Sequence, residues 1–293
     1  MRRTTHSPTA RAPIRVALAW RRPYAALLLG AAVGLSPLSL RAAELADLVR
    51  EQQVVQVNGA NETWKLEWDA LPASACGPDD VSIALACPCS GFAYGEAGKL
   101  SLVRLRRGAI RETLDLTGFF RPGSVPVAGN LAVLQRWQPV PASAHDEDDD
   151  WHHASDFNFL TRVRARGPAA VMRIADYNHD GRANEFLLQV AAAGCGRHTM
   201  VLVGVSKYNL RLHVFASADA PDEPLELDAR TWEAVRKSVQ PVQAVESSCE
   251  LQGSSVESLV TVDVRQGIFH VQRSERPCAS PVGARPAGAT PAS

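Results

Sequence analysis

Hydrophobic and polar residues alternate along much of this chain, and such alternation is typical of strands that bury one face. The clearest example is "TWKLEW", which places Trp64, Leu66 and Trp68 on the same side of an extended segment. Since the runs are short and separated by turn-forming residues, they favour antiparallel strands.

Pairs of alternating runs meet at short connections that contain glycine. Leu100–Leu105 and Ile110–Leu116 flank Arg107-Gly108, and a second pair of runs flanks Gln266-Gly267. Glycine adopts the positive φ that a tight hairpin turn requires. Both places therefore predict a β-hairpin.

Helical spacing is confined to a few segments. Apolar residues recur at helical intervals over residues 44–54, which predicts a short helix there,. In "LDARTWEAVRKSV", Asp228 is a suitable N-cap, and Trp232, Val235 and Val239 share one face,. We therefore predict a mainly β, antiparallel and hairpin-rich fold, propeller-blade-like or sandwich-like, with two or three helices. The sequence has no G-x-G-x-x-G motif, P-loop or βαβ alternation, so nucleotide-binding folds are set aside.

The charge of the chain is unevenly distributed. The formal net charge is zero, but residues 1–42 contain seven arginines and no acidic residue. Removing these from 31 basic and 31 acidic residues leaves 24 against 31, a net charge of −7. A body of that sign lacks the basic surface that nucleic acid requires, so we expect no nucleic-acid partner.

The arginine-rich head is followed by an apolar run from Tyr24 to about Leu40 and by small residues at Ala42 and Ala43. This order is typical of a secretory signal, so we expect residues 1–42 to be removed and the protein to be periplasmic or secreted. The run is short for a membrane span, so we favour cleavage over an uncleaved membrane anchor, which is the alternative. Such an anchor is the one association with a membrane that we expect. Arg21-Arg22 leaves the general and the twin-arginine export routes open.

We expect residues 43–278 to form a β-rich globular domain, with a sub-boundary at the polar loop 141–156 as an alternative. Residues 279–293 are rich in proline, alanine and glycine and predict a disordered tail,. An even number of cysteines in an exported chain predicts disulfides, although the spacing does not select the pairs. The candidates are Cys76, Cys87, Cys89, Cys195, Cys249 and Cys278.

The stretch "ADYNHDGRANEF", residues 175–186, carries oxygen-bearing side chains at alternate positions between two apolar runs that predict strands. Calcium prefers oxygen ligands from carboxylates, amides and backbone carbonyls. The candidate ligands are Asp176, Asn178, Asp180, the carbonyl of Arg182, Asn184 and Glu185. An EF-hand is disfavoured because its twelfth position needs a bidentate Glu, and Leu187 stands there. A metal-free turn is the alternative, because Asn, Asp and Gly are also ordinary turn residues.

This stretch resembles the calcium loop of the FG-GAP or VCBS repeat of integrin-type propellers, which runs D-x-[DN]-x-D-G-x-x-[DN] between strands. The resemblance extends from Val171 to about Ser217, and the rest of the chain resembles uncharacterised exported bacterial proteins, which implies no activity. A propeller needs several blades and the sequence contains one clear copy. The resemblance therefore implies a structural calcium site and does not imply a whole propeller.

A second polar cluster, "HDEDDDWHH", contains His145, His152 and His153 beside acidic residues, a combination that suits zinc, copper or nickel,. The alternative is a solvated acidic loop. We find no G-x-S-x-G, H-E-x-x-H or S-x-x-K motif. The sequence thus favours a non-enzymatic binding or structural protein with a protein or glycan partner that it does not identify. A metal-assisted hydrolase that uses residues 145–153 is the alternative.

Overall fold

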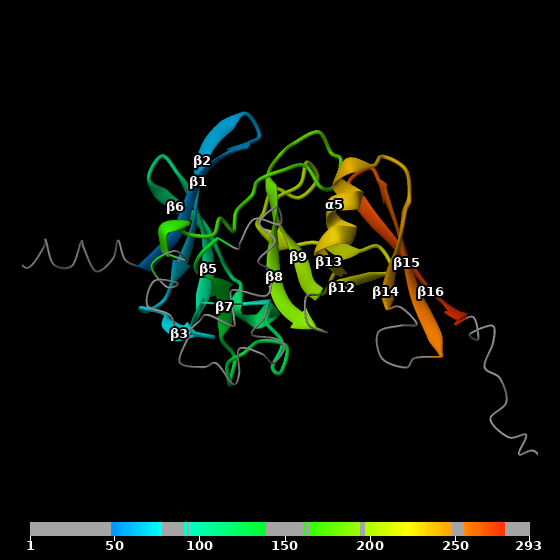
Figure 1. The fold of residues 1–293 in the computed structure, drawn as a ribbon. Coiled ribbons are helices and arrows are strands. Elements are labelled where there is room, and N and C mark those ends of the chain that lie inside the picture. The colour runs from blue at the N-terminus through cyan, green and yellow to red at the C-terminus, as the bar shows by residue number, and fades with distance from the viewer. Residues whose placement is uncertain are drawn as a thin grey trace, which may run out of the picture.

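The computed structural model describes residues 48–77, 91–92, 94–138, 161, 164–193, 197–247 and 255–278. Within them the fold is mainly β, as predicted, and its strands form open, mostly antiparallel sheets. Figure 1 shows these sheets side by side, with the N-terminal strands at one end, β8 (Glu185–Ala193) and β9 (Arg197–Gly204) in the middle and the C-terminal strands at the other end. The predicted signal, the polar loop 141–156 and the tail 279–293 lie outside the described residues.

The first sheet has four antiparallel strands in the order β1-β2-β5-β6. The strands are β1 (Val49–Val57), β2 (Ala60–Trp68), β5 (Leu100–Arg106) and β6 (Ala109–Asp115). The side chains of Trp64, Leu66 and Trp68 are buried on one face of β2, which confirms the prediction from their alternation. The predicted hairpin at Arg107-Gly108 is also confirmed, since it joins β5 to β6.

The predicted helix over residues 44–54 is wrong where the structure describes it, because β1 begins at Val49. Val55 and Val57 are buried while Gln56 between them is exposed, which is the two-residue period of a strand. The helical spacing of apolar residues over the rest of the segment concealed this period. The decisive signal is Asn58-Gly59, where φ is 53° and 75°. Positive φ at both positions defines the type I′ hairpin turn, for which Asn-Gly is the preferred pair.

A smaller sheet packs beside the first one. It has the order β3-β4-β7, formed by β3 (Ala73–Ala75), β4 (Gly95–Gly98) and β7 (Ala132–Gln135). A 3-10 turn, η3 (Thr117–Phe119), follows β6. These elements contribute Ala97, Ala132 and Val133 to the same hydrophobic core as the first sheet.

The hairpin of β8 (Glu185–Ala193) and β9 (Arg197–Gly204) lies in the middle of the molecule. Phe186, Val201 and Val203 on one face belong to the core of the N-terminal sheets. Leu202, on the opposite face of β9, belongs to a second core that contains Trp232. Burial on both faces explains why β9 has a continuous apolar run and does not alternate.

The C-terminal part comprises a five-stranded sheet in the order β12-β11-β16-β15-β14, together with β10 and β13, which pair with β9. The strands are β10 (His213–Val214), β11 (Ala216–Ser217), β12 (Ala220–Pro224), β13 (Glu226–Asp228), β14 (Val242–Ser247), β15 (Val256–Arg265) and β16 (Ile268–Pro277). The predicted hairpin at Gln266-Gly267 is confirmed, since it joins β15 to β16.

One α-helix lies wholly within the described residues, α5 (Ala229–Lys237), between β9 and the C-terminal sheet. Asp228 is its N-cap and accepts a hydrogen bond from the backbone N–H of Arg230, as the sequence predicts. Trp232 and Val235 are buried. Val239, expected on the same face, is 81% exposed because the helix ends two residues before it.

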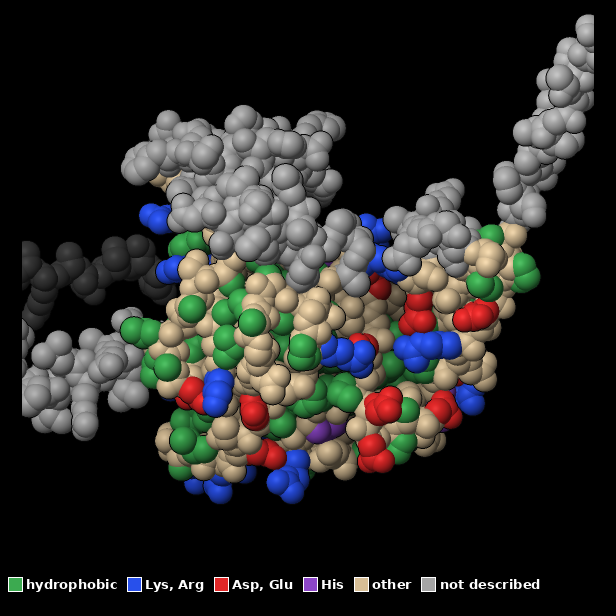
Figure 2. Space-filling view, turned by 90° about the horizontal axis from the view of Figure 1, so that it is seen from below, with side chains coloured by type: hydrophobic (Ala, Val, Ile, Leu, Met, Phe, Trp, Pro, Cys, Tyr) green, Lys and Arg blue, Asp and Glu red, His purple; other side chains and the backbone are tan. Residues whose placement is uncertain are grey.

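Figure 2 shows acidic and basic side chains interspersed over one face of the molecule, with apolar side chains gathered over the half that contains the N-terminal sheets. Several side chains on the strands form ion pairs, among them Arg273 with Glu246 at 3.1 Å. Among the described residues, no helix has the length and apolar character to cross a membrane.

Candidate cation site

The candidate loop lies at one end of the β8–β9 hairpin and is closed at its base. The backbone N–H of Ala175 donates to the carbonyl of Glu185 at 2.9 Å, and the N–H of Glu185 donates back to Ala175 at 3.2 Å. The preceding segment, residues 169–174, forms no strand, so the strand predicted before the loop is wrong. The single bridge at Ala175 takes its place.

The alternate polar side chains turn inward and accept hydrogen bonds from the loop's own backbone. The N–H of Asp180 donates to Asp176 Oδ1 at 3.2 Å and to Asn178 Oδ1 at 3.0 Å. The N–H of Gly181 donates to Asp176 Oδ2 at 3.0 Å, and that of Arg182 donates to Asp180 Oδ1 at 3.0 Å. Both oxygens of Asp176 and the Oδ1 of Asp180 accept one such bond each and retain a further lone pair, so these three oxygens can still bind a cation,.

Backbone conformation at two positions makes the tight turn possible. His179 has φ of 55° and Gly181 has φ of 87°, and both values lie in the left-handed region. Glycine adopts this region without strain, whereas histidine accepts a cost there. The reversal brings the backbone N–H of Asp180 to the side chains of both Asp176 and Asn178.

Three polar residues of the loop are completely buried, namely Asn178, Asn184 and Glu185. Glu185 Oε2 accepts a hydrogen bond from the N–H of Tyr177 at 3.0 Å. Burial raises the pKa of Glu185 to about 9, and the neighbouring charges of Asp180 and Asp176 act in the same direction. A carboxyl group in this position is therefore electrostatically costly as an anion unless a positive charge accompanies it.

Asn184 lies at the centre of an oxygen cluster. Its inward amide atom is 2.7 Å from Glu185 Oε1, 2.9 Å from the carbonyl oxygen of Val205 and 3.3 Å from that of Arg182. With its nitrogen turned inward, the amide donates hydrogen bonds to these three oxygens. With its oxygen turned inward, the amide would need a cation or the proton of a neutral Glu185 beside it, so the inward nitrogen is the orientation that satisfies the cluster when no cation is bound,.

The structure thus brings all six predicted ligand residues into one connected group, and it adds residues that sequence spacing did not indicate. Val205 contributes its carbonyl oxygen, and the N–H of Lys207 donates to Asp180 Oδ2. The pairing of Glu185 with Gly204 brings this second segment to the loop. A motif confined to consecutive positions cannot reveal a partner that strand register supplies.

The chemistry of the oxygens restricts the cation that would fit. No group of three or more His, Cys, Asp or Glu side chains with the arrangement of a metal site occurs among the residues that the structure describes, so Asp176, Asp180 and Glu185 do not converge as three carboxylates. A cation at the loop would depend on a mixture of carboxylate, amide and carbonyl oxygens. Hard cations such as calcium accept this mixture, whereas zinc and copper favour nitrogen and sulfur ligands.

The other candidates of the sequence lie mostly outside the described ranges. His145, His152 and His153 are among them, so the structure carries no geometry for the proposed hydrolase. Of the cysteines, Cys76 and Cys278 are described, and both are disulfide-bonded. The remaining disulfide candidates, Cys87, Cys89, Cys195 and Cys249, lie outside the described residues.

Comparisons with protein-family models, with curated proteins and with solved structures find no match to this chain. The resemblance of the loop to the FG-GAP repeat therefore remains a prediction, and the function has to be argued from the site itself.

Proposed function

We propose that this protein is an exported β-rich protein with a non-enzymatic binding or structural role, in which the loop 175–185 binds calcium and the bound calcium stabilises the fold. The observation that carries the proposal is the buried oxygen cluster around Asn184 and Glu185, next to the carboxylates of Asp176 and Asp180. Calcium between these oxygens would compensate the charge that burial makes unfavourable.

The expected affinity is weak. Asp176 and Asp180 are the two carboxylates of the alternate motif, and the remaining ligands are amides, carbonyls and Glu185, whose raised pKa favours its neutral form. Few charged ligands favour dissociation constants of about 10⁻⁴–10⁻³ M, the range of extracellular calcium modules. At millimolar calcium this affinity stabilises the folded state by roughly 0.4–1.4 kcal/mol, because ligand binds the folded state alone.

Export is supported by the arginine-rich head with its apolar run and by the disulfide bonds of Cys76 and Cys278. Disulfides persist in oxidising compartments such as the periplasm and the extracellular space. A stabilising calcium site fits the same surroundings, since calcium is at its most abundant outside the cytosol. We expect the partner to be a protein or a glycan.

The test is a pair of thermal melts, one in millimolar calcium and one in chelator, for the mature protein and two variants. Asp180→Asn removes the charge and keeps one acceptor oxygen, which can serve one of the N–H groups of Arg182 and Lys207, since these bond to different oxygens of Asp180,. The matched control is Asp219→Ala, at an exposed position of the turn before β12. We expect calcium to raise the melting temperature of the wild type and of the control and to have little effect on Asp180→Asn. Equal melting temperatures of the wild type in calcium and in chelator would overturn the proposal.

A further inference from the structure

The segment Val205–Leu212, which connects β9 to β10, contacts the candidate loop at its first residues. The N–H of Val205 donates to the carbonyl of Asn184 at 3.2 Å, and the N–H of Lys207 donates to Asp180 Oδ2. The carbonyl of Val205 also belongs to the oxygen cluster around Asn184. The position of these first residues therefore depends on the arrangement of the loop's oxygens.

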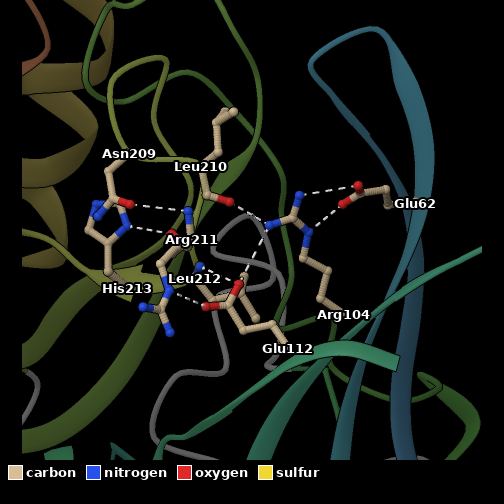
Figure 3. A network of polar contacts seen from close by, with 8 residues as sticks. All are labelled: Glu62, Arg104, Glu112, Asn209, Leu210, Arg211, Leu212 and His213. Atoms are coloured by element: carbon tan, nitrogen blue, oxygen red, sulfur yellow. Dashed lines mark hydrogen bonds and ion pairs between the residues drawn. The ribbon is translucent and has the colours of Figure 1, made fainter. Parts of the chain in front are cut away.

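The last residues of the same segment contact the first sheet instead, as Figure 3 shows. Arg104 on β5 donates to the carbonyl of Leu210. Glu112 on β6 accepts the N–H of Leu212 at 2.9 Å and forms an ion pair with Arg104 at 3.5 Å. Two backbone groups of the segment are thus held by two charged side chains of the N-terminal sheet.

The charged side chains of this network are poorly solvated, so they depend on hydrogen bonds from protein groups that are held in the right place. Arg104 also pairs with Glu62 on β2, and the side chains of Arg104 and Glu62 are 12% and 3% exposed. A buried charge that loses a hydrogen-bonding partner is strongly destabilised. A shift of the carbonyl of Leu210 or of the N–H of Leu212 would therefore weaken a network of three charges.

Between its two ends the segment is internally braced. The N–H of Ser206 donates to the carbonyl of Asn209 at 2.8 Å, and the N–H of Asn209 donates to Ser206 Oγ, also at 2.8 Å. Ser206 Oγ accepts a second bond from the N–H of Tyr208. A turn closed by these bonds moves as a unit, so a displacement at Val205 is passed on to Leu210.

From these contacts we infer that calcium at the loop 175–185 controls how firmly the first sheet is attached to the centre of the molecule, through the segment Val205–Leu212. Calcium holds the oxygens of Asp180, Asn184 and Val205 together, which fixes the start of the segment, and the braced turn aligns its end with Arg104 and Glu112. Leu212 is only 6% exposed and packs in the N-terminal core, which Phe186 and Val203 of the β8–β9 hairpin share, so extensive apolar contact remains without calcium. The effect is thus a loosening of the attachment and not its loss. The inference rests on the proposed calcium binding.

Thermodynamic linkage gives a direct test, because a contact that calcium strengthens must in turn strengthen calcium binding. Glu112→Gln removes a charge from the attachment without altering a residue of the loop. We expect calcium titration of this variant by calorimetry to give a dissociation constant about fivefold higher than that of the wild type, the lower part of the usual range of coupling. The matched control is Glu246→Gln, which removes an ion-paired glutamate from β14, and its affinity should equal that of the wild type.

Hydrogen exchange of the wild type supplies a second readout and decides the question even if Glu112→Gln fails to fold. Calcium should slow exchange at the loop, at the N–H of Leu212 and along β6. If calcium binds but its protection stops at residue 185 and Glu112→Gln binds calcium as tightly as the wild type, the inference is wrong while the proposed calcium binding stands. If the wild type does not bind calcium, the proposed function itself is wrong, and this inference falls with it.

Discussion

The carboxylate of Asp180 accepts a hydrogen bond from the backbone N–H of Lys207, which lies 27 residues further along the chain. This contact joins the two connections at one end of the β8–β9 hairpin, the loop before β8 and the segment after β9. The register of the hairpin makes the contact possible, since Glu185 at the start of β8 pairs with Gly204 at the end of β9. The site is therefore a product of the hairpin as much as of the motif.

Gly204 is expected to be the most sensitive glycine near the site. A Cβ atom there would lie 2.3 Å from the carbonyl oxygen of Asn184 and 2.8 Å from the Cα of Glu185, both backbone atoms that cannot move freely. Overpacking of this kind lowers the free energy of unfolding by about 1–3 kcal/mol, and we expect the loss for Gly204→Ala at the upper end of that range. The substitution should also reduce the stabilisation that calcium provides. Denaturant unfolding in calcium and in chelator measures both. Gly118→Ala, where a Cβ meets nothing within 4 Å, should change stability by less than about 0.5 kcal/mol.

The hairpin turns allow a prediction of increased stability. Arg107 and Gly108 have φ of 53° and 78°, the combination of a type I′ turn. A left-handed residue other than glycine is strained, and asparagine tolerates this conformation better than arginine. We expect Arg107→Asn to raise the free energy of unfolding by about 0.5 kcal/mol. The reverse change at the equivalent position, Asn58→Arg with φ of 53°, should lower it by a similar amount. Equal stabilities of the two variants would contradict the assignment of strain.

Sequence patterns predicted those parts of the fold in which one local signal dominates. Alternation identified β2, and glycine-containing turns identified the hairpins at Arg107-Gly108 and Gln266-Gly267. The N-cap preference of Asp228 correctly located the start of α5. In each case the residues that determine the element lie within a few positions of one another, so no tertiary contact was needed.

The errors occurred where tertiary contacts override or extend a local signal. Residues 49–57 have mixed spacing, and pairing with β2 selects the strand. Five of the six residues 169–174 are apolar, yet the segment forms no strand. Glu51 on β1 instead accepts the N–H of Val171 at 2.6 Å and that of Met172 at 3.2 Å. At the candidate site, the carbonyl oxygen of Val205 reaches the loop because of the strand register, so the spacing of the motif could not predict it.

Trp232 is expected to contribute strongly to the second core. Its side chain is fully buried, its ring centroid lies 5.3 Å from that of Phe269, and its Nε1–H donates to the carbonyl of Met200 at 3.0 Å. Trp232→Ala should destabilise the protein by about 3–5 kcal/mol, because it removes the ring and leaves a cavity. Trp232→Phe keeps an aromatic ring and loses the hydrogen bond, so its cost should be clearly smaller. Urea unfolding of both variants provides the check, and a loss below about 1 kcal/mol for alanine would refute this role.

The cysteines provide a prediction about the mature protein. Cys76 and Cys278 are disulfide-bonded, and the chain has six cysteines in all. If the protein is exported as proposed, all of them should be oxidised, since the oxidising compartment preserves such bonds. Thiol labelling of the exported protein under denaturing conditions without reductant should detect essentially no free thiol, whereas labelling after reduction should detect all six. Two free thiols per chain before reduction would mean that a pair such as Cys87 and Cys89 serves another purpose.

Two histidines are expected to make the protein less stable in mild acid. Burial lowers the pKa of His198 and of His213, although Asp228 opposes the shift at the first, and a hydrogen bond to Arg211 together with the charge of Glu112 opposes it at the second. Because the folded-state pKa of each lies below its ordinary value of 6.5, the unfolded chain binds protons more readily. The stability associated with these neutral rings is therefore complete above about pH 6.5 and declines as the pH falls below that value.

Measurement of the free energy of unfolding at several pH values between about 5 and 7.5 tests this prediction, since most carboxyl groups titrate below that range. Glu185, whose folded-state pKa is raised to about 9, gives the opposite trend in this range, and it does so equally in every variant,. The histidine contribution is therefore the difference from the wild type. His198→Gln and His213→Gln each remove one titrating ring, so each variant should lose less stability toward the acidic end than the wild type, and the double variant should differ from it most. Glu233 makes a useful internal comparison, because its hydrogen bonds to Arg236 and Lys237 lower its pKa to about 2. Its contribution is lost only as the pH falls below the ordinary glutamate value of 4.5, so Glu233→Gln should leave the slope between pH 5 and 7.5 unchanged. A decline of the same slope in the wild type and in the double histidine variant would show that other groups cause it.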